Sequence, residues 1–320
     1  MNESTEKQKQ KESLKIFLRQ ALGETICSAL DDDDITEIMV NPDGSLWLES
    51  RQKGKYRAGI LDEQMADNFL MQLASYRGIF INSDNPRIST TLPFNNERIE
   101  ATIMPISTRA AFSIRKHSKE VYSLSDYVEK GILKREHVKS IQNAIRYRKN
   151  ILVSGGPGSG KTTLANAIIK EMYQICDKTE RIIILEDTAE LQCEMPNQYP
   201  MTTDKKISMT ELLQSAIRLR PDRIFVGEVR DKAALDLLKA WNTGTPGGIA
   251  TIHSNAGVEA ALIRLLYLAQ EAQVPPPHNL IAETVNSIIH ISFDPAHPAG
   301  RVVKDIVELK GYEDGKFIFE

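Results

Sequence analysis

The sequence of 320 residues contains only three cysteines, Cys27, Cys176 and Cys193. They are odd in number, far apart and without metal-ligand spacing, which argues against both a disulfide framework and structural zinc. No apolar run approaches the roughly 18 residues that a membrane-spanning helix needs. The first residues are polar and mixed in charge, unlike a secretory signal. We therefore expect a cytosolic protein.

The chain also has little net charge, because 40 basic residues nearly balance 43 acidic ones, leaving −3. This balance argues against a protein whose main partner is a nucleic-acid backbone. A content of 41% hydrophobic and 26% charged residues is typical of a globular protein. The length suits about two domains.

The first half of the chain predicts a small α+β domain over residues 14–115, after a flexible segment 1–13. Apolar residues at helical spacing between Leu14 and Leu30 predict a helix with one buried face. We favour a core helix, and the alternative is a helix that contacts a membrane or a partner. Two apolar segments around the turn at 41–44 predict a hairpin. A helix is expected around residues 65–73, and further strands near 97–105 and 111–116.

The second half predicts an α/β domain over residues 126–320, joined to the first by a polar linker at 116–125. Apolar strands alternate with helices, and this order predicts a mainly parallel sheet covered on both faces. The expected strands are residues 151–154, 181–186, 223–227, 248–252 and 287–292. The expected helices are residues 161–175, 209–219, 232–242 and 258–269, with a further one around 138–145. The last twenty residues predict a terminal hairpin.

A phosphate-binding loop of the form G-x-x-x-x-G-K-[ST] lies between the first of these strands and the helix that follows it. Its glycines let successive backbone N–H groups point at phosphate oxygens, and the helix start adds a positive dipole. Lys161 would reach the β- and γ-phosphates of ATP, and the Thr162 hydroxyl would bind Mg²⁺. The alternative is a glycine-rich turn with a solvated lysine. The predicted nucleotide-binding residues are Gly155, Gly156, Pro157, Gly158, Ser159, Gly160, Lys161, Thr162 and Thr163.

Hydrolysis needs an acidic group that orients water, a metal ion and stabilisation of the transferred charge. Such groups are expected at the carboxyl ends of parallel strands beside the phosphate loop. Two predicted strands end there in acids, one at Glu186 and Asp187 and the other at Glu228. A third ends at His253.

These segments resemble the ATPases of type II and type IV secretion and pilus assembly, which have a RecA-like P-loop core. EDTAELQ (186–192) is similar to their Asp box, RLRPDRIFVGEVRD (218–231) to their Walker B region and GGIATIHSN (247–255) to their His box. Together with the phosphate loop, these are four motifs in the family's order. The resemblance extends to ITEIMVNPDG and IRK in the first half. LLKAWNTG and the His box are most similar to the TrbB family of conjugal-transfer ATPases.

The resemblance implies roles for individual residues. Glu228 would polarise the attacking water, and the alternative for it is a salt-bridged residue at the end of a strand. Glu186 would act through metal-bound water or as a second base, and these two roles could be exchanged. His253 would contact the γ-phosphate. Arg98 and Arg115 match positions from which relatives reach the nucleotide from the first domain, and the alternative for each is a surface ion pair. The family commonly has histidine at Thr245, so we expect no essential chemistry there.

The resemblance also implies a homohexameric ring on the cytoplasmic face of the inner membrane, as part of a conjugative type IV secretion apparatus. In this picture ATP draws the two domains together through the arginines and hydrolysis releases them. One alternative is a nucleic-acid-stimulated motor on a similar core. The other is a scaffold that binds ATP without hydrolysing it.

Overall fold

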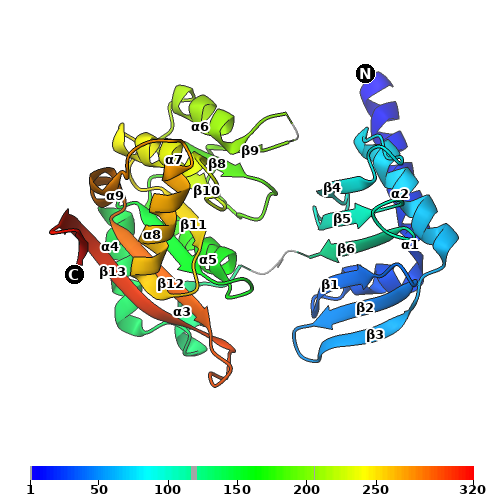
Figure 1. Cartoon of the computed structure of the whole chain (residues 1–320), viewed down its shortest axis with the longest axis horizontal. Coiled ribbons are helices and arrows are strands. Elements are labelled where there is room, and N and C mark those ends of the chain that lie inside the picture. Colours follow the sequence, from blue (N-terminus) through cyan, green and yellow to red (C-terminus); the bar gives the residue numbers. More distant parts are fainter. Residues whose placement is uncertain (1, 117–120, 205) are drawn as a thin grey trace. The chain divides into compact units, whose positions relative to one another are not determined.

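The computed structural model describes the backbone of residues 2–116, 121–204 and 206–320, and side chains from residue 12 onward. The chain divides into two compact units, Met1–Lys119 and Glu120–Glu320 (Figure 1). Each has its own sheet, and the first unit has one hydrophobic core whereas the second has two, one on each face of its sheet.

The first unit contains a six-stranded antiparallel sheet in the order β3-β2-β1-β6-β5-β4. Helices α1 and α2 pack together and bury the apolar side of the sheet. Helix α2 begins at a side-chain cap, Asp62, and ends at Gly78 in the left-handed conformation. The elements are α1 (Asn2–Asp31), β1 (Ile35–Val40), β2 (Ser45–Ser50), β3 (Gly54–Ile60), α2 (Glu63–Arg77), β4 (Arg87–Thr91), β5 (Arg98–Thr102) and β6 (Ala111–Arg115).

Helix α1 confirms the core interpretation of the first apolar stripe. Leu18, Leu22, Ile26 and Leu30 are buried, whereas the Phe17 side chain is exposed. The helical backbone starts at Asn2, twelve residues before the predicted start of the helix. It is interrupted at Gly23, whose φ of 76° and ψ of 169° are not helical.

The second unit contains an eight-stranded sheet in the order β14-β13-β12-β7-β11-β10-β8-β9. The strands from β12 to β9 in that order are mutually parallel, and β13 and β14 add an antiparallel edge. This is the predicted α/β fold with a terminal hairpin. The elements are α3 (Leu124–Glu129), α4 (Arg135–Arg146), β7 (Ile151–Gly155), α5 (Lys161–Ile175), β8 (Ile182–Glu186), β9 (Gln198–Thr202), α6 (Met209–Arg218), β10 (Arg223–Val226), α7 (Ala233–Asn242), β11 (Ile249–His253), α8 (Gly257–Gln270), α9 (His278–Thr284), β12 (Ser287–Phe293), β13 (Arg301–Glu313) and β14 (Lys316–Phe319).

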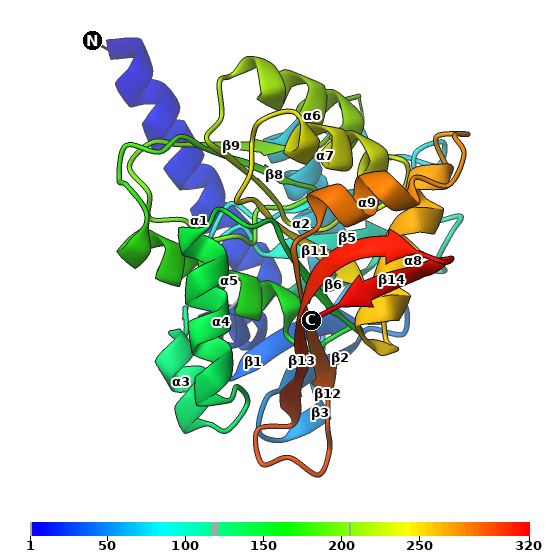
Figure 2. The same cartoon turned by 90° about the vertical axis from the view of Figure 1, so that its left-hand side faces the viewer.

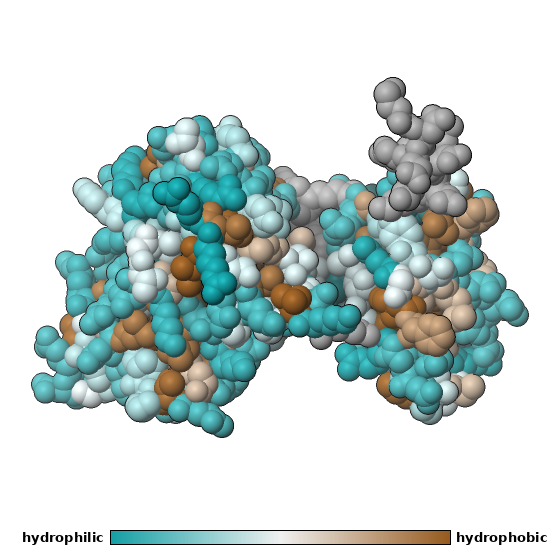
Figure 3. All heavy atoms as spheres, turned by 90° about the horizontal axis from the view of Figure 1, so that it is seen from above, coloured by the Kyte–Doolittle hydropathy of each residue, from teal (hydrophilic) through white to brown (hydrophobic). Residues whose placement is uncertain are grey.

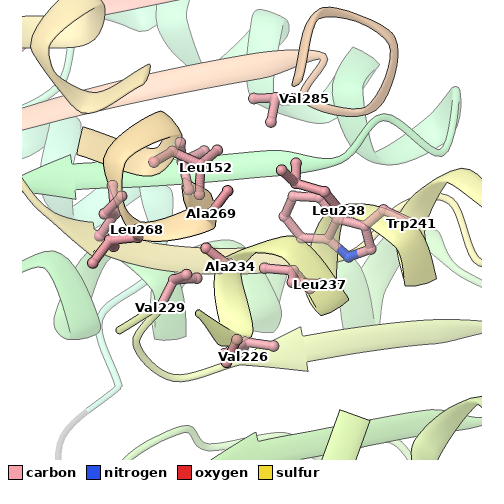
Figure 4. Packing of buried hydrophobic residues seen from close by; sticks show 14 of the residues in the cluster. Leu152, Val226, Val229, Ala234, Leu237, Leu238, Trp241, Leu268, Ala269 and Val285 are labelled. Carbon is pink, nitrogen blue, oxygen red and sulfur yellow. The ribbon is translucent and has the colours of Figure 1, made fainter. Parts of the chain in front are cut away.

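Helices cover both faces of this sheet, with α3, α4 and α5 on one face and α6 to α9 on the other (Figure 2). Successive residues of β7 point to opposite faces, so Leu152 enters one core and Val153 the other. Figure 4 shows Leu152 packed with side chains of α7 and α8, including Leu238 and Ala269. Two buried faces explain why these strands are almost wholly apolar.

Some elements were not predicted. Helix α3 begins inside the expected linker, where Ser123 and Asp126 form a capping box; residues 117–120 of that linker lie outside the described residues. Strand β9 is a largely exposed edge strand that contains Pro200, so its sequence has no buried pattern. Helix α9 directly follows the three prolines at 275–277.

The surface seen in Figure 3 is mostly hydrophilic on both units, with small, scattered hydrophobic areas. In the described part of the chain, none of the helices has the length and apolar character that crossing a membrane requires.

Candidate active site

The phosphate-binding loop joins β7 to α5, as the motif predicts. Gly158 and Gly160 have φ values of 67° and 95°, a left-handed conformation that favours glycine. At Gly155 the reason for glycine is lack of space, because a Cβ there would lie 2.3 Å from the Ile291 carbonyl oxygen. The Ser159 hydroxyl donates to the Gly156 carbonyl oxygen at 2.9 Å and closes the loop. The backbone is therefore shaped as an anion cradle requires.

Lys161 is the first residue of α5, and its ammonium group lies inside the loop. Its Nζ donates to the Gly156 carbonyl oxygen at 2.9 Å and lies 3.1 Å from Nδ1 of His253. Because the ammonium has only donors, Nδ1 accepts, and the imidazole is neutral with its proton on Nε2. Burial, with Lys161 as the second cause, lowers the His253 pKa. The site thus holds one buried cation beside a neutral imidazole.

Glu228 lies beside this pair, two residues after the end of β10. Its Oε1 is 3.5 Å from Nδ1 of His253, and its Oε2 accepts a hydrogen bond from Arg230. Arg230 also donates to Asp187 at 3.2 Å. The Arg230 guanidinium holds the Glu228 carboxylate by a direct hydrogen bond, and the Lys161 ammonium attracts it by charge, so the carboxylate lies near the phosphate loop.

Glu186, at the end of β8, is only 3% exposed. Burial raises the pKa of its carboxyl to about 7, although its Oε1 accepts hydrogen bonds from the backbone N–H groups of Glu190 at 2.9 Å and Leu191 at 2.8 Å. Gly227 leaves the space that this side chain fills, since a Cβ at Gly227 would lie 2.9 Å from Cγ of Glu186. The glycine before Glu228 is therefore needed by the neighbouring acid.

The parallel register brings these groups together. His253 pairs with Gly155 across β11 and β7, and Leu185 pairs with Val226 across β8 and β10. The strands end at one edge of the sheet, where His253 and Glu228 lie beside Lys161, and Glu186 lies against Gly227 at the end of the neighbouring strand. Asn166 of α5 binds the Asp-box segment by donating to the Glu190 carbonyl and accepting from the Gln192 N–H.

The donor set around the loop fits a magnesium ion that is held largely by substrate phosphates. Thr162 follows Lys161 in the first turn of α5, and Glu186 has one carboxylate oxygen that does not bind Glu190 or Leu191. No cluster of three or more His, Cys, Asp or Glu side chains in the described chain could hold a metal by itself. Mg²⁺ needs no such cluster, because it uses one or two protein ligands with phosphate and water.

Arg98 and Arg115 belong to the first unit and lie opposite each other on β5 and β6. Arg115 donates to Glu37 at 2.9 Å and is largely exposed, which is the surface ion pair considered as its alternative. The geometry within the first unit does not test whether either arginine reaches a nucleotide. Their role stays a prediction.

Other residues of the site were not predicted as functional. Arg230 links the acids of two strands, and its proximity to Glu228 in the sequence was the available signal. The Asn255 side chain lies over the loop, because a Cβ on Gly156 would be 2.3 Å from its Oδ1. Thr245 is buried, and its hydroxyl donates to the Ala240 carbonyl at the end of α7 at 2.6 Å. This contact is structural.

Comparison with known families gives a match to the model described as "Type II/IV secretion system protein" over residues 83–294. The matched region includes the phosphate loop, the Asp box, the Walker B region and the His box. It covers more than half of the chain.

Several relatives are similar over most of their length. A probable conjugal transfer protein TrbB of Sinorhizobium fredii is 43% identical over 95% of this chain and 92% of its own. The conjugal transfer protein TrbB of Rhizobium radiobacter is 42% identical over 94% of this chain and 91% of its own. The type IV secretion system protein VirB11 of Bartonella henselae is 32% identical over 78% of this chain and 80% of its own.

Solved structures share the fold. The pilus retraction motor PilT with bound ADP has a TM-score of 0.62 at 20% identity, covering 88% of this chain and 80% of PilT. The ATPase DotB of Legionella pneumophila has a TM-score of 0.61 at 16% identity, covering 87% of this chain and 77% of DotB. With these motifs, this fold and these relatives, the chain belongs to the type II/IV secretion system protein family, and within it to the TrbB group of conjugal transfer proteins.

Proposed function

We propose that this protein is a motor ATPase that binds ATP with Mg²⁺ and hydrolyses it to ADP and phosphate. The observation that carries the proposal is the meeting of Lys161, His253 and Glu228 within hydrogen-bonding or near-contact distance beside a glycine-shaped phosphate loop. A solvated lysine after a plain turn would have none of these contacts. The match to a family of secretion system proteins and the fold shared with the ATPase DotB of Legionella pneumophila support the same reaction.

Glu228 is the group that we assign to polarise the attacking water. It lies beside the ammonium and imidazole groups that would face the γ-phosphate. Glu186 is more deeply buried, and one of its oxygens is already bound by two backbone N–H groups. It suits the positioning of metal-bound water better than direct proton transfer, although exchange of the two roles remains the alternative.

Mg²⁺ would be held by the Thr162 hydroxyl and, through water, by Glu186. The ion supplies charge neutralisation on the transferred phosphoryl group. The protein contributes preorganised groups: Lys161 as a fixed cation and the loop N–H groups as donors.

A phosphate-release assay on the purified, assembled protein tests the proposal. Lys161→Ala should abolish MgATP binding and turnover, and Glu228→Gln should keep binding but reduce turnover by at least about 100-fold. Lys178→Ala and Glu259→Gln remove comparable charges at exposed positions outside the site and should leave turnover unchanged. Binding without turnover in the wild-type protein would favour the nucleotide-gated scaffold instead.

The biological process follows from the relatives. Proteins named for conjugal transfer and type IV secretion cover most of this chain, so we assign it to a conjugative type IV secretion apparatus that assembles a pilus or transfers DNA and protein. We expect a homohexamer on the cytoplasmic face of the inner membrane. Turnover that rises when the protein assembles would support this arrangement. Stimulation of turnover by single-stranded DNA that falls steeply with salt would instead point to the nucleic-acid motor.

Arg98 and Arg115 are assigned to ATP-dependent closure of the two units. Their position opposite each other on neighbouring strands would let both guanidinium groups reach one set of phosphates. Arg115→Ala should slow turnover and weaken closure measured by distance labels on the two units. Unchanged turnover together with unchanged closure would remove Arg115 from the mechanism.

A further inference from the structure

Arg301, the first residue of β13, contacts the phosphate loop from the side opposite to the acids. It pairs with Phe293 of β12, and β12 in turn places Ile291 opposite Gly155 at the end of β7. The Val303 N–H donates to the Ile132 carbonyl at 2.8 Å and fixes the start of β13. A Cβ on Gly160 would lie 2.6 Å from Nη1 of Arg301. The guanidinium therefore rests on the residue directly before Lys161.

The Arg301 guanidinium has no partner in the part of the chain that the structure describes, where neither a hydrogen bond nor an ion pair engages it. Two other arginines of this unit differ, because Arg223 binds Glu180 and Arg230 binds Glu228 and Asp187. Arg301 is only partly exposed. Burial raises the pKa of the Tyr127 hydroxyl, and the nearby charge of Arg301 offsets part of this rise. A half-buried guanidinium without a counter-ion is a strong donor set for a bound anion.

The sheet order indicates which part of a nucleotide Arg301 faces. Strands β11, β10 and β8 lie on one side of β7 and carry His253, Glu228 and Glu186, whereas β12 and β13 lie on the other side. The phosphate that is cleaved must lie beside the acids. The opposite end of the triphosphate, which carries the nucleoside, therefore points toward β13.

We propose that Arg301 binds the α-phosphate of the nucleotide, as a positioning residue that fixes substrate and product alike. The proposal rests on the proposed function of the loop as the nucleotide site. Gly160 is part of it, since its missing side chain lets the guanidinium approach the loop. Because ADP keeps the α-phosphate, Arg301 would strengthen ADP and ATP binding equally and leave the chemical step unaffected.

Binding constants for ATP, ADP, AMP and adenosine on the full chain test this assignment. Arg301→Ala should weaken ATP, ADP and AMP about tenfold, the effect of one hydrogen bond to a charged group. Adenosine binding should not change. KM should rise with kcat unchanged, and Arg301→Lys should recover part of the affinity. Lys304→Ala, which removes an exposed charge from the same strand, should behave as wild type.

Two outcomes separate this inference from the proposed function. Unchanged ADP affinity in Arg301→Ala, with binding abolished in Lys161→Ala, would overturn the inference alone. Binding that survives Lys161→Ala would overturn the nucleotide site itself. A reduced kcat with unchanged ADP affinity would also contradict the α-phosphate role. Should Arg301→Ala misfold, Arg301→Gln keeps much of the side chain without its charge and carries the same test.

Discussion

Replacing Glu186 by glutamine should make the protein more stable at alkaline pH while reducing its activity. The folded pKa is raised to about 7 from the ordinary value of 4.5, mainly by burial. The folded state therefore keeps a proton that the unfolded chain has lost between these two pH values. The contribution of this group to stability is fully present below pH 4.5 and is lost as the pH rises through 7. Glutamine resembles the protonated carboxyl and does not lose that contribution.

The magnitude follows from the shift. The pKa of Glu186 differs by about 2.5 between the folded and the unfolded chain, which corresponds to about 3 kcal/mol in the free energy of unfolding at pH 8. About 2–3 kcal/mol of this loss develops between pH 5 and pH 8. The side chain is only 3% exposed, so solvent screens this term little. Glutamine also keeps an oxygen that can accept from the Glu190 and Leu191 N–H groups. The stabilisation relative to wild type should therefore grow with pH.

Urea unfolding of wild type and Glu186→Gln at pH 5 and pH 8, in the absence of nucleotide and magnesium, measures this difference. Glu259→Gln, at an exposed position, serves as the matched control and should show no pH-dependent gain. Equal stability differences at the two pH values would refute the buried, proton-retaining environment of Glu186. So would a glutamine variant that is less stable than wild type at pH 8.

Three further changes test separate parts of the structure. Gly227→Ala should lower the free energy of unfolding by about 1–3 kcal/mol and reduce turnover, because the new Cβ would lie 2.9 Å from Cγ of Glu186. A variant as stable as wild type in unfolding assays would contradict this crowding. Thr245→Val removes the hydrogen bond to the Ala240 carbonyl and should lower the free energy of unfolding by about 1 kcal/mol, with kcat unchanged. A large fall in kcat would show that Thr245 takes part in the chemistry. Ser208→Ala removes the capping box of α6 and should lower the free energy of unfolding by about 1 kcal/mol, which a lower thermal midpoint would report. An unchanged midpoint would contradict that role of Ser208.

Most helices and strands of the second unit could be predicted from the sequence because its strands are buried on both faces. Apolar runs such as residues 151–154 are unambiguous when they alternate with amphipathic helices, and α5 begins and ends where predicted, at Lys161 and Ile175. Edge elements were harder. Strand β9 has exposed residues and a proline, and β3 is mostly exposed, so neither has a buried pattern that single-sequence reasoning can detect.

The site was predictable as far as strand ends could be located. Glu186, Glu228 and His253 follow apolar strands, and parallel pairing brings such positions to one edge. The environment of each group was not predictable, because it depends on contacts between distant segments. The burial of Glu186 depends on the absence of a side chain at Gly227, and the approach of Arg301 to the loop depends on the register of β12 and β13.

The most direct test of the nucleotide site is a crystal structure of the protein with Mg²⁺ and a non-hydrolysable ATP analogue. The phosphates should lie in the loop between Gly156 and Thr162, with Lys161 Nζ bound to phosphate oxygen in place of its contacts to the Gly156 carbonyl and His253. Phosphates bound elsewhere, or a loop without ligand at saturating analogue, would contradict the assignment of this protein as an ATP-driven motor.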